Sequence, residues 1–431
     1  MPGIYAYRRA RLVNDSGRHI KINANMDKNH AISLSPMHIA LFIRSFGGSG
    51  GARFVLNIAR CLSDKGHRVD LVMGRKEGYY LDEIPAKVRI VDLAVRSSLQ
   101  ALGSLTRVHG DGMALAKMVL MPKSHWVLGA IPGLAHYLIC ERPQVMISAM
   151  DYPNIAAILA RDVSQVSTKL IVTVHIALSV KVANNQQKRR IRAYPKVARR
   201  FYPKSDAIVA VSKGVAKDLA KVINLPLNRI TTIYNPVITP EIKDHATEYA
   251  CDWFYPGSPP VILAVGKLKP AKDFPTLLRA FARVRGMMKA RLIILGEGEQ
   301  RVKLLKQAQD LGISDDLYMP GFVKNPFSYM AKASVFVLSS AWEGLPTVLI
   351  EALACGCPVV STNCPSGPAE ILENGRFGTL VPVGDYAALA EAIFHCIKNP
   401  PDQNILMARG REFSIEHATE EYLALVKRLC A

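Results

Sequence analysis

The sequence of 431 residues is poor in acidic side chains and has few cysteines. It contains 35 Asp or Glu against 55 Lys or Arg, which gives a formal net charge of +20. This imbalance indicates an anionic partner, such as a nucleic acid, a phosphorylated substrate or an acidic membrane surface. Eight dispersed cysteines are not a disulfide framework. Cys355, Cys357 and Cys364 lack the spacing of a metal site, so we expect buried or incidental thiols.

Long apolar runs are also missing. The most apolar region, Met113 to Cys140, is interrupted by charged residues and a proline, so no membrane-spanning helix is expected. The N-terminus is basic but lacks the apolar segment of a secretory signal. We therefore expect a cytoplasmic protein.

Several cofactor motifs are absent. The segment FGGSGGAR, residues 46–53, matches neither a P-loop nor the dinucleotide fingerprint with its downstream acid. This speaks against a nicotinamide-dependent oxidoreductase. No DxD motif with supporting context and no His, Asp and Glu cluster is apparent, so neither a catalytic metal nor another cofactor is expected.

The segments that are present alternate between strand-like and helix-like patterns, which predicts an α/β fold with doubly wound parallel sheets. Residues 1–36 lack periodicity and are expected to be a disordered or extended tail. The fold is therefore expected to start at Met37, and the native chain at either Met1 or Met37. Two strand-helix series follow, over 37–236 and 261–413, joined by a linker at 237–260. A last helix, about 414–431, is expected to pack back on the first series.

A basic segment stands out within the first series. From Lys181 to Lys204 there are nine Lys or Arg and no Asp or Glu. The pattern fits either a solvated helix face or a dedicated electrostatic surface. Few aromatic residues and no nucleic-acid motif accompany it, so a nucleic-acid-binding protein is disfavoured.

Two glycine-bearing turns could bind a diphosphate. Gly47 and Gly48 precede a helix that contains Arg53, and form either a tight turn or a cradle of backbone amides. In VGKLKPAKDFP, Lys267 follows a strand and Lys272 precedes a helix. Two ammonium groups beside a helix N-terminus favour binding of an anion over solvated loop lysines.

The stretch WEGLPTVLIEALACGCPVV contains Glu343 and Glu351. Pro346 suits the first position of a helix, so Glu343 is expected in the preceding loop and Glu351 in the second helical turn. A pair that flanks one glycosidic bond, as in a glycosidase, is disfavoured by this spacing. We interpret the two carboxylates as anchors along one elongated ligand. His175 and Asp151 each end a strand and are either buried structural residues or side chains in the crevice.

In this order the segments resemble the retaining glycosyltransferases of family 4, which have the GT-B fold of two Rossmann-like domains facing a central cleft. The resemblance covers roughly Met37 to Lys427. It is strongest in VGKLKPAKDFPTLLRAF, LIILGEGEQRVKLLKQAQDLGI and AWEGLPTVLIEALACGCPVVSTNCPSGPAEIL, the last of which contains the Glu-x7-Glu signature.

The resemblance implies site residues. Glu343 would contact the transferred sugar, Glu351 the donor ribose, and Lys267 and Lys272 the departing diphosphate, with His175 near the reacting carbon. Arg53 and Asp151 would lie on the acceptor side. The remaining positions expected around the donor are Gly47, Gly48, Gly266, Gly296, Gly321, Phe322, Val323, Gly344, Leu345, Pro346, Thr347 and Val348.

The implied reaction is transfer of a hexose or N-acetylhexosamine, from a UDP-sugar in preference to GDP-mannose. The implied acceptor is a glycan or lipid-linked saccharide of cell-surface polysaccharide synthesis. We expect no cofactor, because the nucleotide sugar is a co-substrate. Residues 181–204 and the apolar patches near 113–139 are expected to hold the protein peripherally on an anionic inner membrane surface. A sugar-nucleotide epimerase of the same architecture is the main competing enzyme.

Overall fold

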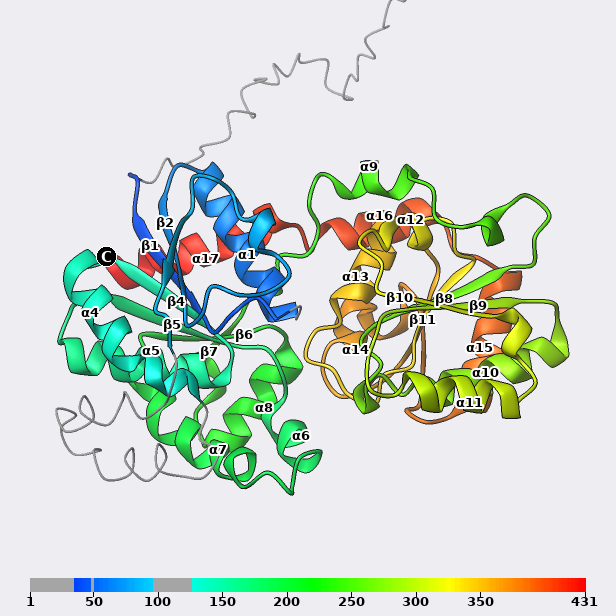
Figure 1. The fold of residues 1–431 in the computed structure, drawn as a ribbon, viewed down its shortest axis with the longest axis horizontal. Coiled ribbons are helices and arrows are strands. Elements are labelled where there is room, and N and C mark those ends of the chain that lie inside the picture. Colours follow the sequence, from blue (N-terminus) through cyan, green and yellow to red (C-terminus); the bar gives the residue numbers. More distant parts are fainter. Residues whose placement is uncertain (1–34, 48–49, 96–125) are drawn as a thin grey trace, which may run out of the picture. The chain divides into compact units, whose positions relative to one another are not determined.

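The computed structural model describes residues 35–47, 50–95 and 126–431. Figure 1 shows two open sheets, each covered by helices. The first has seven strands in the order β3-β2-β1-β4-β5-β6-β7, and the second has six in the order β10-β9-β8-β11-β12-β13. Every strand pair described is parallel. The predicted α/β fold with two doubly wound parallel sheets is therefore confirmed.

The first sheet and its helices form the N-terminal half. Its strands and helices alternate along the chain, as the sequence pattern predicts. The elements are β1 (His38–Ile43), α1 (Gly50–Asp64), β2 (Arg68–Met73), β3 (Arg89–Asp92), α4 (Ile131–Glu141), β4 (Val145–Ala149), α5 (Asp151–Ser164), β5 (Lys169–Val174), α6 (Leu178–Ala183), α7 (Arg189–Phe201), β6 (Ala207–Ala210), α8 (Lys213–Ile223) and β7 (Ile230–Thr232).

The second sheet and its helices form the C-terminal half. Strands and helices alternate here too, and α10 follows the turn that contains Lys272, as predicted. The elements are β8 (Val261–Val265), α10 (Phe274–Met287), β9 (Arg291–Leu295), α11 (Arg301–Asp310), β10 (Leu317–Gly321), α12 (Phe327–Met330), β11 (Val335–Leu338), α13 (Thr347–Ala354), β12 (Val359–Thr362), α14 (Pro368–Ile371), β13 (Thr379–Val381), α15 (Tyr386–Lys398) and α16 (Gln403–Arg411).

The strands read as continuous apolar runs because both faces of each sheet are covered. In β8, Leu263 belongs to one apolar cluster, while Ile262 and Ala264 belong to another on the opposite face. In β11, Phe336 and Val337 alternate in the same way. Side chains of a strand alternate between faces, so one sequence of apolar residues fills two cores. The sheets thereby hold their strand-end loops in fixed positions.

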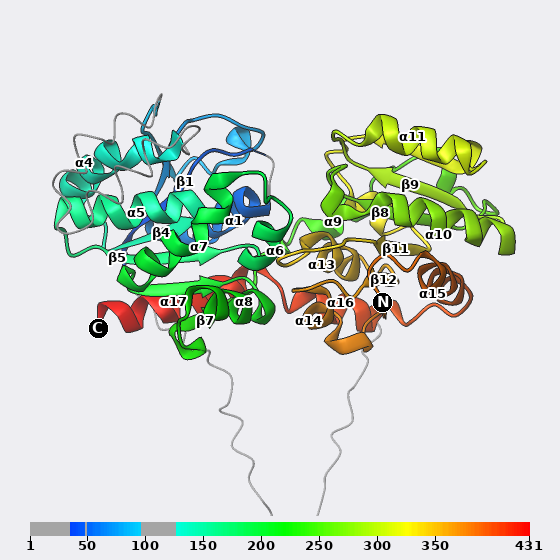
Figure 2. The same ribbon diagram turned by 90° about the horizontal axis from the view of Figure 1, so that it is seen from below.

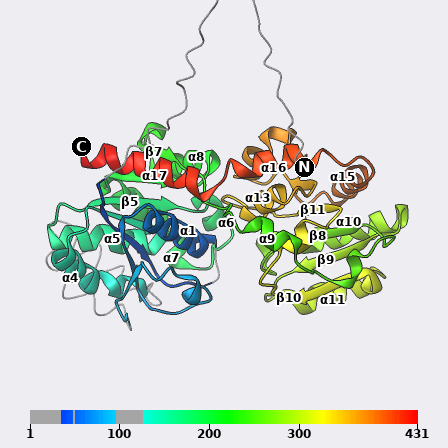
Figure 3. The same ribbon diagram turned by 90° about the horizontal axis from the view of Figure 1, so that it is seen from above.

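The chain passes between the halves twice. The segment 237–260, expected to be an irregular linker, contains a short helix, α9 (Ile242–Thr247). Beyond α16, helix α17 (Ile415–Cys430) contacts α1 of the N-terminal half, where the rings of Phe54 and Tyr422 lie 5.8 Å apart. Figure 2 and Figure 3 show α17 beside the first sheet from opposite sides.

Some expectations fall outside the described residues. The tail 1–36 lies almost wholly in the undescribed range 1–34, and β1 begins one residue after Met37. Most of the apolar region 113–139 is undescribed too. In its described part, Ile131, Leu134 and Leu138 are buried in the core, whereas Ile139 is 47% exposed. Among the described helices, none has the length and apolar character needed to cross a membrane.

Candidate active site

Lys272 and Glu343 form an ion pair at the carboxyl ends of neighbouring strands. Lys272 lies in the turn after β8, and Glu343 in the loop after β11. Lys272 Nζ donates to Glu343 Oε1 at 2.6 Å, and Ser340 Oγ donates to the same oxygen at 2.7 Å. The two charged side chains are only 20% and 14% exposed. Glu343 thus holds the Lys272 ammonium in a defined position at the strand ends, where it could also contact a phosphate.

Lys267 is in a different environment from Lys272. It is exposed, and its Nζ donates to the Gly47 carbonyl of the N-terminal half at 3.3 Å. Burial of the amine and the neighbouring Lys269 lower its pKa. The two lysines both follow β8, as expected, but have different partners. Gly48, expected in the same diphosphate loop as Gly47, lies outside the described residues.

Glu351 lies in the second turn of α13, as expected. No described side chain donates a hydrogen bond to its carboxyl group. Burial raises the pKa of Glu351 to about 7, although Arg53 and Lys272 act in the opposite direction. A largely buried acid costs free energy unless it is hydrogen-bonded, so a group of this kind with no side-chain donor among the described residues is typical of a binding site. Arg53 of α1 also pairs with Glu83 at 2.5 Å.

The segment between the two glutamates has a tightly packed backbone. A Cβ at Gly344 would lie 2.0 Å from the carbonyl oxygen of His175, and the Gly344 carbonyl accepts from Ser212 Oγ at 2.9 Å. Pro346 precedes the helix as its N-cap, so the prediction that it is the first helical residue is wrong by one position. The Leu349 amide donates to Pro346 O at 3.0 Å, whereas the amides of Thr347 and Val348 at the start of α13 have no intrahelical acceptor one turn back and suit an anion.

His175 follows β5 and packs edge-on against the Phe54 ring, with centroids 4.9 Å apart. Thr173 Oγ1 lies 2.8 Å from His175 Nε2 and donates its only hydrogen to the Ser148 carbonyl at 2.9 Å. Nε2 must therefore carry the ring proton, because Thr173 can only accept from it. Nδ1 is left as a buried acceptor without a partner. Burial lowers the pKa of His175 to about 4, so the ring is neutral near pH 7.

Three glycines bring the strand-end loops of the second sheet together. Gly266 donates to Leu295 O at 2.9 Å, and Gly296 donates to Gly321 O at 2.7 Å. A Cβ at Gly296 would lie 2.1 Å from the Gly266 carbonyl oxygen. Phe322, after Gly321, is 66% exposed, with the Tyr79 ring 6.5 Å away. The expected donor positions Leu345 and Val348, and also Val323, are buried or partly buried.

Asp151 begins α5 and forms an ion pair with Lys181 of α6. Both line a cavity of about 410 Å³ at the carboxyl ends of strands in the first sheet. Burial lowers the pKa of Lys181 to about 8, with a contribution from Arg190. The other residues around this cavity are Ile43, Arg44, Ser45, Gly47, Glu77, Met150, Tyr152 and Pro153.

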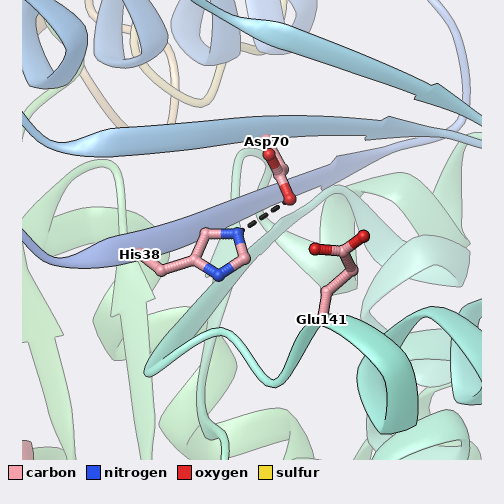
Figure 4. Close-up of side chains that lie close together, drawn as sticks. All are labelled: His38, Asp70 and Glu141. Atoms are coloured by element: carbon pink, nitrogen blue, oxygen red, sulfur yellow. Dashed lines mark hydrogen bonds and ion pairs between the residues drawn. The ribbon is translucent and has the colours of Figure 1, made fainter.

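A group of possible metal ligands occurs away from these loops, among His38, Asp70 and Glu141 (Figure 4). Asp70 accepts from His38 at 2.8 Å, Tyr137 at 2.7 Å and Arg89 Nε at 2.9 Å. Arg89 also donates to Glu141 at 2.9 Å. The guanidinium already occupies the position between the carboxylates, so this cluster is an ion-pair network rather than a metal site.

Some contacts of the site are not apparent from the sequence. Glu370 accepts from the amides of Lys213 and Gly214, at 2.7 Å each, and so holds the N-terminus of α8 from the other half. Ser340 and Lys181 were likewise not predicted. Glu370 and Lys181 meet partners that lie 157 and 30 residues away in the chain, so only the tertiary structure brings them together, whereas Ser340 lies three residues before its partner Glu343.

Comparison with known proteins gives two family matches. Residues 48–240 match the model described as Glycosyltransferase Family 4, and residues 250–413 match that of Glycosyl transferases group 1. The solved structure of Anabaena HepE in complex with UDP and glucose superposes with a TM-score of 0.67 at 16% identity, and covers 91% of this chain and 100% of that one.

Two relatives come from Campylobacter jejuni. An N-acetylgalactosamine-N,N'-diacetylbacillosaminyl-diphospho-undecaprenol 4-alpha-N-acetylgalactosaminyltransferase is 32% identical over 57% of this chain and 64% of its own length. An alpha-1,4-N-acetyl-D-galactosaminyltransferase that acts on a diNAcBac-PP-undecaprenol-linked disaccharide is 25% identical over 90% of this chain and 98% of its own. The chain thus matches less than two thirds of the length of the first relative.

Proposed function

Since the chain belongs to the family 4 glycosyltransferases, with a C-terminal group 1 domain, we propose that it transfers a sugar from a nucleotide sugar to a lipid-linked or glycan acceptor of cell-surface polysaccharide synthesis. The transferred sugar is a hexose or N-acetylhexosamine, and the donor is a UDP-sugar. A GDP-mannose-dependent mannosyltransferase is the alternative. The relatives from Campylobacter jejuni, whose names specify diphospho-undecaprenol acceptors, support the lipid-linked acceptor.

The observation that carries the proposal is the contrast between the two glutamates of one loop and helix. Glu343 is paired with Lys272, whereas Glu351 has a raised pKa and no described donor. Vicinal ribose hydroxyls would supply the hydrogen bonds that Glu351 lacks. The amides at the start of α13 lie between the two positions and suit the diphosphate. The arrangement thus fits one nucleotide sugar along the segment.

The proposed mechanism retains the anomeric configuration. The acceptor hydroxyl attacks the anomeric carbon from the face that the nucleotide diphosphate leaves, and its proton passes to the departing phosphate oxygen. Lys272, Lys267 and the α13 amides stabilise the charge that develops on this phosphate, which is the main catalytic contribution. Glu343 orients the Lys272 ammonium and contacts the sugar. His175 is neutral, and its unprotonated Nδ1 would accept a hydrogen bond from the substrate, while Nε2 donates to Thr173.

The donor is tested with a panel of nucleotide sugars. Thermal stabilisation of the protein by each compound ranks the donors, and nucleotide release is then measured with and without acceptor. A transferase releases nucleotide in step with glycosylation of the acceptor, whereas an epimerase changes the sugar without any acceptor. Proton NMR of the glycosidic linkage reports whether the configuration is retained.

We also propose that the protein acts at the inner face of the membrane. Helix α7 buries Ile191, Tyr194 and Phe201 in the core, so its apolar face is not available to lipid. Its exposed side carries arginines and lysines, which makes the contact electrostatic. Flotation with anionic liposomes should recover the protein at low salt and lose it as ionic strength rises. Binding that does not respond to salt would contradict this mode.

A further inference from the structure

Two consecutive buried serines, Ser339 and Ser340, directly follow β11. Ser339 Oγ donates to the Lys272 carbonyl at 2.8 Å, and the amide of Ala341 donates to the Ala271 carbonyl, also at 2.8 Å. The backbone of this loop is therefore hydrogen-bonded to the turn after β8 that carries Lys272.

The backbone is also fixed on both sides of Glu343. Thr362 Oγ1, at the end of β12, donates to the Ser340 carbonyl at 2.6 Å. On the other side, Gly344 packs so closely against the His175 carbonyl that a Cβ would lie 2.0 Å from its oxygen. Because the chain is held before and after Glu343, the contacts of the Glu343 side chain itself decide where its carboxylate lies.

The two described hydrogen bonds of the Glu343 carboxylate end on the same oxygen. Lys272 Nζ and Ser340 Oγ donate to Oε1 at 2.6 Å and 2.7 Å. Oε2 accepts no hydrogen bond from the residues that the structure describes. An ionised carboxylate accepts hydrogen bonds on both oxygens, and an ammonium group has three hydrogens. The ion pair therefore keeps an acceptor on Glu343 and donors on Lys272 for a ligand.

Ser340 opposes a more closed form of this ion pair. A lysine ammonium can contact both oxygens of a carboxylate, which would turn Oε2 toward Lys272 and away from a ligand. The Ser340 hydroxyl, whose residue is 0% exposed, gives its single hydrogen to Oε1 without competition from bulk water. A hydrogen bond to an ionised acceptor is stronger than one between neutral groups, so it resists rotation of the carboxylate.

We propose that Ser340 is a positioning residue for transfer, which presents Oε2 of Glu343 to the transferred sugar. The assignment rests on the proposed function, because it presumes that Glu343 contacts this sugar. A sugar hydroxyl donates to Oε2, and Lys272 keeps ammonium hydrogens for the leaving phosphate. Ser340 thus allows the ion pair to serve both parts of the donor, although it acts only through Glu343.

The first test is Ser340→Ala, measured by initial-rate kinetics with donor titration. We expect kcat to fall about tenfold, because a hydrogen bond to a charged group is lost, and donor KM to change less than about twofold. Ser205→Ala is the matched control. Ser205 is also buried, but it donates to the Tyr202 carbonyl before the amino end of β6, and its variant should keep the wild-type kcat.

A double-mutant cycle with Glu343→Gln separates positioning from general loss of structure. If Ser340 acts through the carboxylate, Ser340→Ala lowers kcat about tenfold in the wild-type background and less than about twofold beside Glu343→Gln. A loss of the same size in both backgrounds overturns the proposal. Thermal unfolding shows that the variants compared are folded.

Crystal structures of wild type and S340A give a result that does not depend on activity. We expect Oε2 of Glu343 to approach Lys272 Nζ in S340A, and an unchanged carboxylate overturns the positioning role. If wild type transfers no sugar from any nucleotide donor, the proposed function fails, and these structures still decide what Ser340 does. If wild type and S340A transfer sugar equally fast, only the positioning role fails.

Discussion

The loops at the carboxyl ends of the strands differ between the two halves. In the C-terminal half, the loops after β8, β9 and β10 are joined by backbone hydrogen bonds through Gly266, Gly296 and Gly321. In the N-terminal half, the loops after β1 and β4 leave a cavity lined with charged side chains such as Arg44 and Lys181. Backbone contacts suit a ligand portion of constant shape, such as a nucleotide diphosphate. Side-chain contacts suit a ligand whose structure differs from one enzyme to another, such as the acceptor.

The largest effect on transfer is expected at Lys272. Replacing it with Ala removes the cation proposed to stabilise the leaving phosphate and should lower kcat by about 10³-fold, with a much smaller change in donor affinity. Initial-rate kinetics with donor titration measures both quantities. Lys269→Ala, in the same loop but exposed, is the control. A variant at Lys272 with unchanged kcat would contradict the role.

The close packing of the strand-end loops in the C-terminal half is tested at Gly296. Its φ of 135° and the Gly266 carbonyl 2.1 Å from an added Cβ leave no room for Ala. We expect Gly296→Ala to lower kcat/KM for the donor about 100-fold, because a displacement of the loop by about 1 Å has costs of this order. Gly286→Ala, in α10 with open space around it, should instead leave kinetics unchanged. A similar loss in both variants would argue against a local effect.

A smaller effect with a distinctive pH profile is expected at Glu351. The folded-state pKa is raised to about 7, so the carboxylate form becomes dominant only above neutral pH. If the carboxylate accepts hydrogen bonds from the ribose, donor KM should fall as the pH rises from 6 to 8. Glu351→Gln should raise donor KM about tenfold at pH 8 and abolish this pH dependence, since a charged hydrogen bond is replaced by a neutral one.

Kinetics at several pH values checks the Glu351 prediction. Glu299→Gln, at an exposed position in another strand-end loop, is the matched control and should keep the wild-type profile. A Glu351→Gln variant that retained the same slope of KM against pH would assign the titration to another group.

Replacing Asp70 is expected to leave kcat unchanged. Asp70 lies in the ion-pair network, away from the carboxyl ends of the strands in the first sheet. Burial opposes its ionisation, but hydrogen bonds from Arg89, Tyr137 and His38 lower its pKa to about 2. A depressed acid pKa stabilises the fold above the unfolded-state pKa, and the contribution of about 2 kcal/mol is lost as pH falls from about 4 toward 2. Asp70→Asn should cost about 2 kcal/mol at pH 7, because it weakens the charge-assisted hydrogen bonds that Arg89, Tyr137 and His38 donate to the buried carboxylate.

Urea unfolding at pH 7 and thermal unfolding between pH 3 and 7 measure these effects of Asp70. Asp64→Asn, an exposed change of the same charge at the end of α1, should be nearly neutral. Equal stability of Asp70→Asn and wild type would mean that the network does not stabilise the N-terminal half.

The strands and most helices were predictable from the sequence because apolar runs of four to six residues, separated by turn residues, have few other interpretations. Pro346 marks the start of a helix, so the positions of Glu343 in a loop and of Glu351 in a helix were predictable too. The Lys272–Glu343 ion pair, the tautomer of His175 and the Glu370 contact were not predictable. Each depends on atoms from distant segments, and a sequence pattern does not specify which distant segment a loop meets. The nucleotide roles of Gly47, Lys267 and Phe322 stay predictions.

The crossings between the halves are joined to each other. The amides of Val237 and Ile238 donate to Phe413 O at 3.0 Å, and the amide of Ile415 donates back to Ile238 O at 3.0 Å. The two connecting segments are thus hydrogen-bonded to each other rather than independent. If the proposed transferase changes the angle between its halves during turnover, we expect both connections to twist together and α17 to shift against α1.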